Sequence, residues 1–255
     1  MIQLLNFEEW DKQEILKKMD SDDFYYNYLG RHALSSSSIK LLYSSPKKYH
    51  YVTQYGQPDS QALRDGWLFH TSILEPDKFA KQRFIEVQSK NTKKYKEALA
   101  EYGKVYTIKE KSDAERLQDA FYQNESALQM ISDCEFEKPA IGIIDGLAFR
   151  GKADAIGKYL VDLKTTRTDI KGFEYSARKF GYDIQVYIYC KLFERHYKDF
   201  RFVVIDKSSL DIGIYTVSED FYNQGKRKTH EAIDRYRTFF INGVDLHSYT
   251  LRGEL

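Results

Sequence analysis

The segments GKADAI and VDLKTT carry two aspartates and a lysine at spacings that can bring their side chains together. Asp162 and Lys164 lie two residues apart, so in a strand both side chains project from one face. Asp154 belongs to the preceding β-prone run, and a turn near Lys158 separates it from Asp162. Two carboxylates that face each other across a hairpin repel unless a cation or a proton lies between them. The pattern therefore indicates a site for a hard divalent cation such as Mg²⁺, which prefers oxygen ligands.

The length of the loop between these two strands decides whether the aspartates meet. A two-residue turn would pair Asp154 with Val161 and put the two aspartates on opposite faces of the sheet. An odd-length loop over residues 157 to 159 would pair Asp154 directly with Asp162. We predict the odd-length loop or an equivalent bulge.

A metal held by these carboxylates would supply hydrolytic chemistry at a phosphate. It would lower the pKa of a bound water and neutralise the charge that builds up on the phosphorus centre. Lys164 would orient that water or stabilise the oxyanion. A lone DxK triplet is more often a pair of solvated residues on an exposed strand. Here the apolar neighbours Leu160, Val161 and Leu163 favour a buried strand, in which an unpaired charge would be costly.

A sheet flanked by helices is needed to position these residues, and the hydrophobic pattern predicts one. From Pro139 onward the runs AIGII, LAFRGKADAI and YLVDLKTT, separated by turn residues, predict a three-stranded antiparallel meander. Two further strands are expected in FRFVVID and DIGIYTV. Helices are expected over residues 7–19, in a short segment capped by Ser36 or Ser37 that stops near Pro46, and over residues 62–75, 110–132, 182–198 and 218–240. We expect an α+β fold in one domain over residues 1–255, mainly helical over 1–135, with the catalytic sheet and helices over 136–255.

Composition limits how the protein can contact nucleic acid. The 255 residues include 39 basic side chains against 38 acidic ones, so no global positive field would attract DNA. Any contact must use a local basic patch. Most charge runs are solvated faces, but basic residues around the catalytic strands could bind phosphates. We expect DNA contacts at Arg150, Lys152 and Arg167, and at Ser37, within a serine run whose simpler role is helix capping.

Cysteine usage and hydropathy exclude several classes of protein. Cys134 and Cys190 are the only cysteines and lie far apart, so neither a disulfide framework nor a cysteine zinc site is supported. Acidic residues follow the short apolar run at the start of the chain, which fits neither a secretory signal nor an anchor. No later apolar stretch approaches the roughly 20 residues that span a bilayer. We expect a soluble, cytoplasmic protein with no membrane contact.

Five segments in a fixed order give the chain a resemblance to a known family. They are LSSSSIKLLYSSPKKY, GWLFHTSILEPDKF, FRGKADAI, VDLKTT and YDIQVYIY. Together they resemble the RecE-like exonucleases (exonuclease VIII type) of phages and prophages, within the PD-(D/E)XK nuclease superfamily. The resemblance implies the central mixed sheet of that superfamily. It also implies that Asp154, Asp162 and His70 bind metal, that Lys164 is the catalytic lysine, and that Gln185 and Tyr189 form a catalytic QxxxY motif.

The same resemblance implies a substrate and partners. The expected activity is a Mg²⁺-dependent exonuclease, with Mn²⁺ as an alternative metal, that acts on double-stranded DNA ends in phage-type recombination. A ring-shaped homo-oligomer and a single-strand annealing protein as partner are implied as well. Two alternatives stay open: an endonuclease or other nuclease of the same superfamily, and a non-catalytic DNA-binding or interaction module on the same fold.

Helical spacing can be compared with the roles that the resemblance implies. On the predicted helix, His70 shares a face with Trp67 and Leu74, at spacings of three and four, so it should point inward. A core histidine bonded to a backbone carbonyl is the simpler interpretation, and the segment order favours a metal or water contact. Gln185 and Tyr189 are four residues apart and share a helical face, which an ordinary packing pair would also do.

Overall fold

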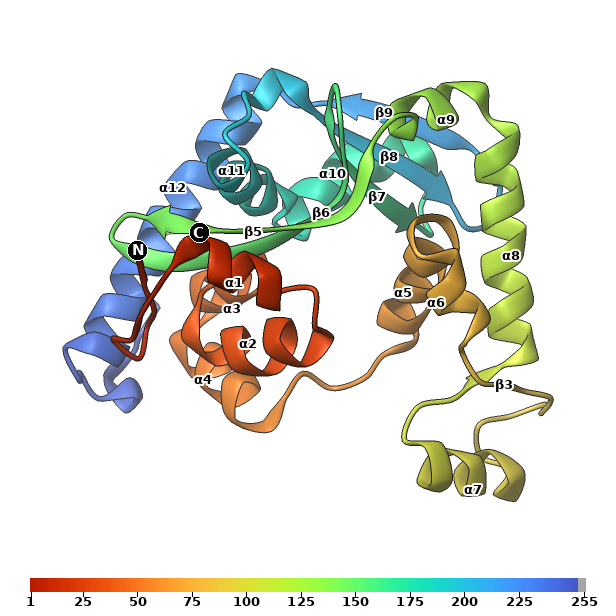
Figure 1. Cartoon of the computed structure of the whole chain (residues 1–255), viewed down its shortest axis with the longest axis horizontal. Helices are drawn as coiled ribbons and strands as arrows, with labels where there is room; N and C mark the ends of the chain where they lie inside the picture. Colours follow the sequence, from red (N-terminus) through yellow and green to blue (C-terminus); the bar gives the residue numbers. More distant parts are fainter. Residues whose placement is uncertain (252–255) are drawn as a thin grey trace.

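A computed structural model describes residues 1–251 of the protein. At its centre is a five-stranded mixed sheet with helices packed around it (Figure 1). The strands, in spatial order, are β5 (Glu135–Ile144), β6 (Leu147–Ile156), β7 (Leu160–Thr166), β8 (Phe200–Asp206) and β9 (Ile212–Thr216). Strands β5, β6 and β7 form an antiparallel meander, β8 pairs parallel to β7, and β9 pairs antiparallel to β8. The expected α+β fold, the meander and the two later strands are confirmed.

Turn chemistry sets the register of the meander. Asp145 and Gly146 both adopt positive φ angles, 48° and 74°, between the paired residues Ile144 and Leu147. A two-residue hairpin turn of this hand favours glycine and aspartate because other side chains rarely take positive φ. The next loop spans residues 157 to 159, since Ile156 pairs with Leu160. The predicted odd-length loop is therefore confirmed.

Helices occupy much of the rest of the chain. They are α1 (Lys12–Lys18), α2 (Leu29–His32), α3 (Ser36–Ser44), α4 (Pro46–Tyr55), α5 (Gln61–Leu74), α6 (Pro76–Ala80), α7 (Lys93–Tyr102), α8 (Ile108–Gln123), α9 (Glu125–Ile131), α10 (Phe173–Lys179), α11 (Tyr182–Leu192) and α12 (Glu219–Tyr236). Two small two-stranded sheets pair β1 (Ile2–Gln3) with β2 (Glu9–Trp10), and β3 (Phe84–Ile85) with β4 (Tyr106–Thr107). Within residues 1–251, the structure has no helix with the length and hydropathy needed to cross a bilayer.

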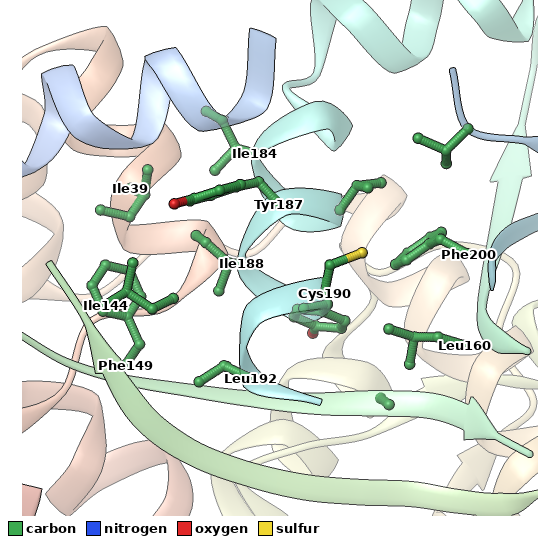
Figure 2. Close-up of a cluster of buried hydrophobic side chains, with 14 of the residues drawn as sticks. Ile39, Ile144, Phe149, Leu160, Ile184, Tyr187, Ile188, Cys190, Leu192 and Phe200 are labelled. Carbon is green, nitrogen blue, oxygen red and sulfur yellow. The ribbon is translucent and has the colours of Figure 1, made fainter. Parts of the chain in front are cut away.

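Two hydrophobic cores lie on opposite faces of strand β7. On one face, α11 packs with α3 and α12 over residues such as Leu160 and Phe200. Figure 2 shows Ile39 of α3 beside Ile184 and Tyr187 of α11 in this core. On the other face, Val161 and Leu163 pack with side chains of α5, α8 and α9. The strand that carries the DxK triplet is thus covered on both faces.

A glycine allows α12 to approach α11 closely. A Cβ atom on Gly225 would lie 2.0 Å from the backbone oxygen of Asp183. No side chain fits there, so only glycine permits this helix contact.

Several predicted helix boundaries are wrong for identifiable reasons. The cap of α3 is Ser35, whose hydroxyl accepts from the N–H of Ser38, instead of Ser36 or Ser37. The first helix begins at Lys12, because Asp11 caps it. Asn124 ends α8 and caps α9, so the helix expected over residues 110–132 is two helices. The helix expected over residues 182–198 ends at Leu192, shortly before Glu194 adopts a φ of 53°.

Candidate active site

Asp154 lies where strands β6 and β7 separate. The ladder between them pairs Ala155 with Val161, and in that register Asp154 would come next to Asp162. The pairing stops there, and Oδ2 of Asp154 accepts a 2.7 Å hydrogen bond from the N–H of Leu163. The carboxylate thereby replaces a backbone acceptor, and it is fixed against the strand that carries Asp162.

Asp162 is held by two side chains in an almost water-free position. It is 1% exposed. Its Oδ1 accepts a 2.5 Å hydrogen bond from Nε2 of Gln185, and its Oδ2 is in direct contact with Nζ of Lys164. Because α11 packs on the face of β7 that carries Asp162, Gln185 of α11 can contact this carboxylate. The structure therefore brings together Asp154, Asp162, Lys164 and Gln185.

The charges in this cluster act on one another. Burial raises the pKa of Asp162, the charge of Lys164 opposes that rise, and the charge of Asp154 adds to it. Burial of Lys164 favours its neutral form, but the charges of Asp162 and Asp154 outweigh burial and raise its pKa above the ordinary value. Lys164 is therefore protonated at neutral pH, and a further cation beside the two carboxylates would relieve their repulsion.

His70 comes from α5 on the other side of Asp154. Its Nδ1 lies 3.3 Å from Oδ2 of Asp154. Burial alone would lower the pKa of His70. The negative charge of Asp154 and its hydrogen bond to the imidazole together outweigh burial and raise the pKa of His70. For Asp154 the effects have the opposite sign: burial alone would raise its pKa, but the charge of His70 brings that pKa below the ordinary value. The imidazole points into the site and contacts a carboxylate there.

Tyr189 lies one helical turn beyond Gln185 on α11 and is 9% exposed. Its ring packs on β6, where a Cβ atom on Gly151 would come within 3.2 Å of it. Burial raises the pKa of Tyr189 well above its ordinary value. Among the hydrogen bonds found within residues 1–251, none joins Tyr189 to either aspartate or to Lys164. A catalytic role for this tyrosine stays a prediction.

A known protein family matches most of the chain. The model of the family described as "PDDEXK-like domain of unknown function (DUF3799)" matches residues 35–244. The chain belongs to this family. Asp154 and the triplet of Asp162, Leu163 and Lys164 lie inside the matched region.

A solved structure shares the fold of this PDDEXK-like domain. A protein from Eubacterium rectale named "Putative exonuclease" aligns with a TM-score of 0.66 at 17% identity, over 92% of this chain and 95% of its own. A phage related exonuclease from Haemophilus somnus 129PT aligns with a TM-score of 0.36 at 15% identity, over 86% of this chain and 99% of its own. No curated protein matches the sequence. Only the Eubacterium rectale protein aligns with a TM-score above 0.5, and at 17% identity this likeness concerns the fold alone.

Two charged residues that sequence reasoning missed also belong to the surroundings of the site. Glu137 of β5 sits opposite Asp154, between the pairs Phe136 with Ala155 and Lys138 with Ala153. Burial and the charge of Asp154 raise its pKa to about 7. Lys40 of α3 is half-buried, and burial together with the charge of Lys164 lowers its pKa to about 7. Neither residue stands out from spacing, because long-range packing brings each to the site.

The residues expected to contact DNA differ in how exposed their side chains are and in whether other protein groups already bind them. The guanidinium of Arg150 donates to the backbone oxygen of Leu29 at 3.2 Å and lies over the ring of Tyr25. Arg150 therefore connects the N-terminal helical region to β6. Lys152 is mostly covered, with Nζ 3.9 Å from a carboxylate oxygen of Glu137.

Two of the expected DNA contacts are exposed. Arg167 is 68% exposed and pairs with Asp65 at 3.2 Å. Ser37 is exposed near the start of α3, and Ser35 performs the capping. DNA contact by all four residues stays a prediction.

The carboxylates of Asp154 and Asp162 offer oxygens of the kind that a magnesium ion takes as ligands. Across residues 1–251, no three His, Cys, Asp or Glu side chains are arranged to enclose a metal by themselves. Mg²⁺ needs fewer protein ligands, because it keeps several waters and takes substrate oxygens. Both bonds to Asp154 fall on Oδ2, and Oδ1 has no hydrogen bond among those found in the described chain. Oδ2 of Asp162 is buried and contacts only Lys164. Asp154 and Asp162 would hold the ion.

Proposed function

We propose that the protein is a Mg²⁺-dependent deoxyribonuclease that hydrolyses DNA phosphodiester bonds, acting as an exonuclease on double-stranded ends. The observation that carries the proposal is the position of Asp162, buried between the ammonium of Lys164 and the amide of Gln185 with Asp154 beside it. A PDDEXK-like domain with this acidic pair and lysine has the parts that metal-dependent phosphodiester hydrolysis requires.

Each residue has a role that follows from its surroundings. A Mg²⁺ ion bound by the two aspartates would activate a water and neutralise charge on the phosphate. Gln185 orients the carboxylate of Asp162, and the N–H of Leu163 orients that of Asp154. Lys164 holds its proton, so it serves as a positive charge that stabilises the oxyanion, and the helices around β7 exclude bulk water. His70 supports Asp154 or completes the metal shell.

The choice of an exonuclease over an endonuclease has separate support. It rests on the order of the five sequence segments and on the shared fold with the Eubacterium rectale protein named as an exonuclease. We extend the proposal to the ring-shaped homo-oligomer, the annealing-protein partner and the use of Mn²⁺ that the resemblance implies.

The proposal is tested by incubating the full chain with linear duplex DNA and Mg²⁺. We expect nucleotide release that stops with EDTA and with Lys164→Ala, and no cleavage of covalently closed circular DNA. Cleavage of the circle would make the protein an endonuclease of the same superfamily. Binding without any metal-dependent release would make it a non-catalytic module, and equal release by wild type, EDTA and Lys164→Ala samples would reject the assigned site.

A further inference from the structure

Among residues 1–251, Lys40 of α3 reaches the site and forms no ion pair there. Ile39 is fully buried against α11, beside Ile184 in Figure 2, and this packing fixes the helical turn that carries Lys40. The stem of Lys40 passes close to Gly181, where Cγ lies 3.4 Å from the position of a Cβ. Its Nζ then lies 4.9 Å from the centre of the Tyr182 ring. Packing therefore directs the amine of Lys40 to the start of α11, at Tyr182.

The same aromatic ring brings Lys40 and Lys164 together. Nζ of Lys164 lies 5.1 Å from the centre of the Tyr182 ring, and Nζ of Lys40 lies at a similar distance. A ring face attracts each ammonium, but it cannot neutralise two. The site thus contains a second amine close to the ammonium that contacts Asp162.

The neighbouring carboxylates already have partners. Asp162 contacts Lys164, and the fully buried Asp183 contacts Nζ of Lys228 at 2.6 Å. Within the described part of the chain, Lys40 makes no ion pair within 4.0 Å and no hydrogen bond. The amine is half-buried, so a positive charge on it is costly unless an anion arrives.

We propose that Lys40 binds a phosphate of the DNA strand undergoing cleavage, as a second cationic group beside Lys164. This inference rests on the proposed nuclease function and adds a substrate-binding residue to it. A backbone phosphate has two non-bridging oxygens, so one can face the carboxylates and Lys164 while the other accepts from Lys40. Lysine is suited to this contact because it acts as a point charge toward phosphate. Burial and the charge of Lys164 already lower the pKa of Lys40, and an arriving anion would favour its charged form.

The test measures binding of the full chain to linear duplex DNA with Ca²⁺ in place of Mg²⁺, by fluorescence anisotropy at several salt concentrations. Lys40→Ala should weaken binding about tenfold and reduce the slope of log affinity against log salt by about 0.9, the value for one phosphate contact. Lys40→Arg should recover most of the affinity. Lys191→Ala, which removes an exposed lysine of α11, is the matched control and should bind like wild type.

A neutral methylphosphonate, placed singly at the scissile or an adjacent position, separates phosphate contact from a packing role. At the contacted position, the methylphosphonate should lower the DNA affinity of wild type about tenfold, and it should lower the affinity of Lys40→Ala less than about twofold. Equal costs in both proteins at every position, or an unchanged salt slope, would overturn the proposal. If wild type cleaves DNA with Mg²⁺ while Lys40→Ala binds normally, only this inference fails. If wild type neither binds nor cleaves DNA, the proposed function fails with it.

Discussion

The amide of Gln185 donates a 2.5 Å hydrogen bond to Oδ1 of Asp162 and so joins helix α11 to strand β7 inside the site. Asp162 is 1% exposed, so protein groups set its orientation in place of water. Lys164 contacts its other oxygen. The carboxylate is thus aligned before any substrate arrives, which is the arrangement that a preorganised hydrolytic site needs.

Loss of this amide should slow the reaction without unfolding the chain. We expect Gln185→Ala to lower kcat about 10- to 100-fold, the usual cost of removing a group that orients a metal ligand. Nucleotide release from linear duplex DNA at saturating Mg²⁺ measures the effect. Gln129→Ala removes an exposed glutamine of α9 and is the control. A Gln185→Ala rate equal to the control would show that the hydrogen bond has no part in catalysis.

Removal of the imidazole should change the metal requirement. His70 lies 3.3 Å from Oδ2 of Asp154, whose only other hydrogen bond comes from Leu163 within the described residues. We expect His70→Ala to raise the Mg²⁺ concentration that gives half-maximal cleavage about tenfold or more, because Asp154 loses its support or the ion loses a ligand. His50→Ala, at an exposed position of α4, should leave that concentration unchanged. An unaltered Mg²⁺ dependence in His70→Ala would place the imidazole outside the metal's surroundings.

Two glycine substitutions should have opposite effects on stability. Gly225→Ala puts a Cβ atom 2.0 Å from the backbone of α11 and should lower the free energy of unfolding by about 2 to 3 kcal/mol through overpacking. Gly66 lies inside α5 with nothing within 4 Å of a Cβ, so Gly66→Ala should raise that free energy by about 0.5 to 1 kcal/mol. Urea denaturation of both variants measures the difference. Equal stability of the two would contradict the close packing of α12 on α11.

A buried carboxylate should make stability depend on pH. Glu110 accepts from Nε of Arg64 and from Nζ of Lys90, both at 2.8 Å, and from the N–H of Thr107. Burial alone would raise the pKa of Glu110, but these bonds bring it well below the ordinary value of 4.5. A depressed folded-state pKa stabilises the protein above the unfolded value, and this stabilisation is lost as the pH falls below it.

Glu110→Gln should therefore cost about 3 kcal/mol in the free energy of unfolding at pH 7, since it leaves Arg64 without its charge partner. The difference from wild type should shrink between pH 5 and pH 3. Chemical denaturation at both ends of this range measures it, and a difference that stays constant would mean that Glu110 is not held ionised by its neighbours. Glu125→Gln, at an exposed position in α9, is the control.

The sequence predicted the parts of the site that depend on local periodicity and turn length. Asp162 and Lys164 share a face because strand geometry requires it. The three-residue loop over residues 157 to 159 was predicted because only an odd-length loop puts the two aspartates in one register. Local competition between caps was harder to judge. Four serines in succession each offer a cap, and only the backbone of Ser35 has the extended conformation that selects it.

Long-range packing determined what the sequence did not predict. Lys40 reaches the site because Ile39 packs on α11, and Glu137 meets Asp154 only through the register of β5 and β6. Arg150 has the positive charge that a phosphate contact needs, but its guanidinium binds the backbone oxygen of Leu29 and lies over the ring of Tyr25. Spacing along the chain contains no signal for any of these three contacts.

The central claim is that Asp162, beside Asp154 and Lys164, gives the protein metal-dependent hydrolysis of DNA. The most direct measurement is the rate of nucleotide release from linear duplex DNA across Mg²⁺ concentrations, for wild type, Asp162→Asn and the exposed-site control Asp119→Asn. The wild-type and control rates should rise with Mg²⁺ and saturate, while Asp162→Asn should be at least about 100-fold slower at every concentration. A folded Asp162→Asn protein with the wild-type rate and the wild-type Mg²⁺ dependence would contradict the claim.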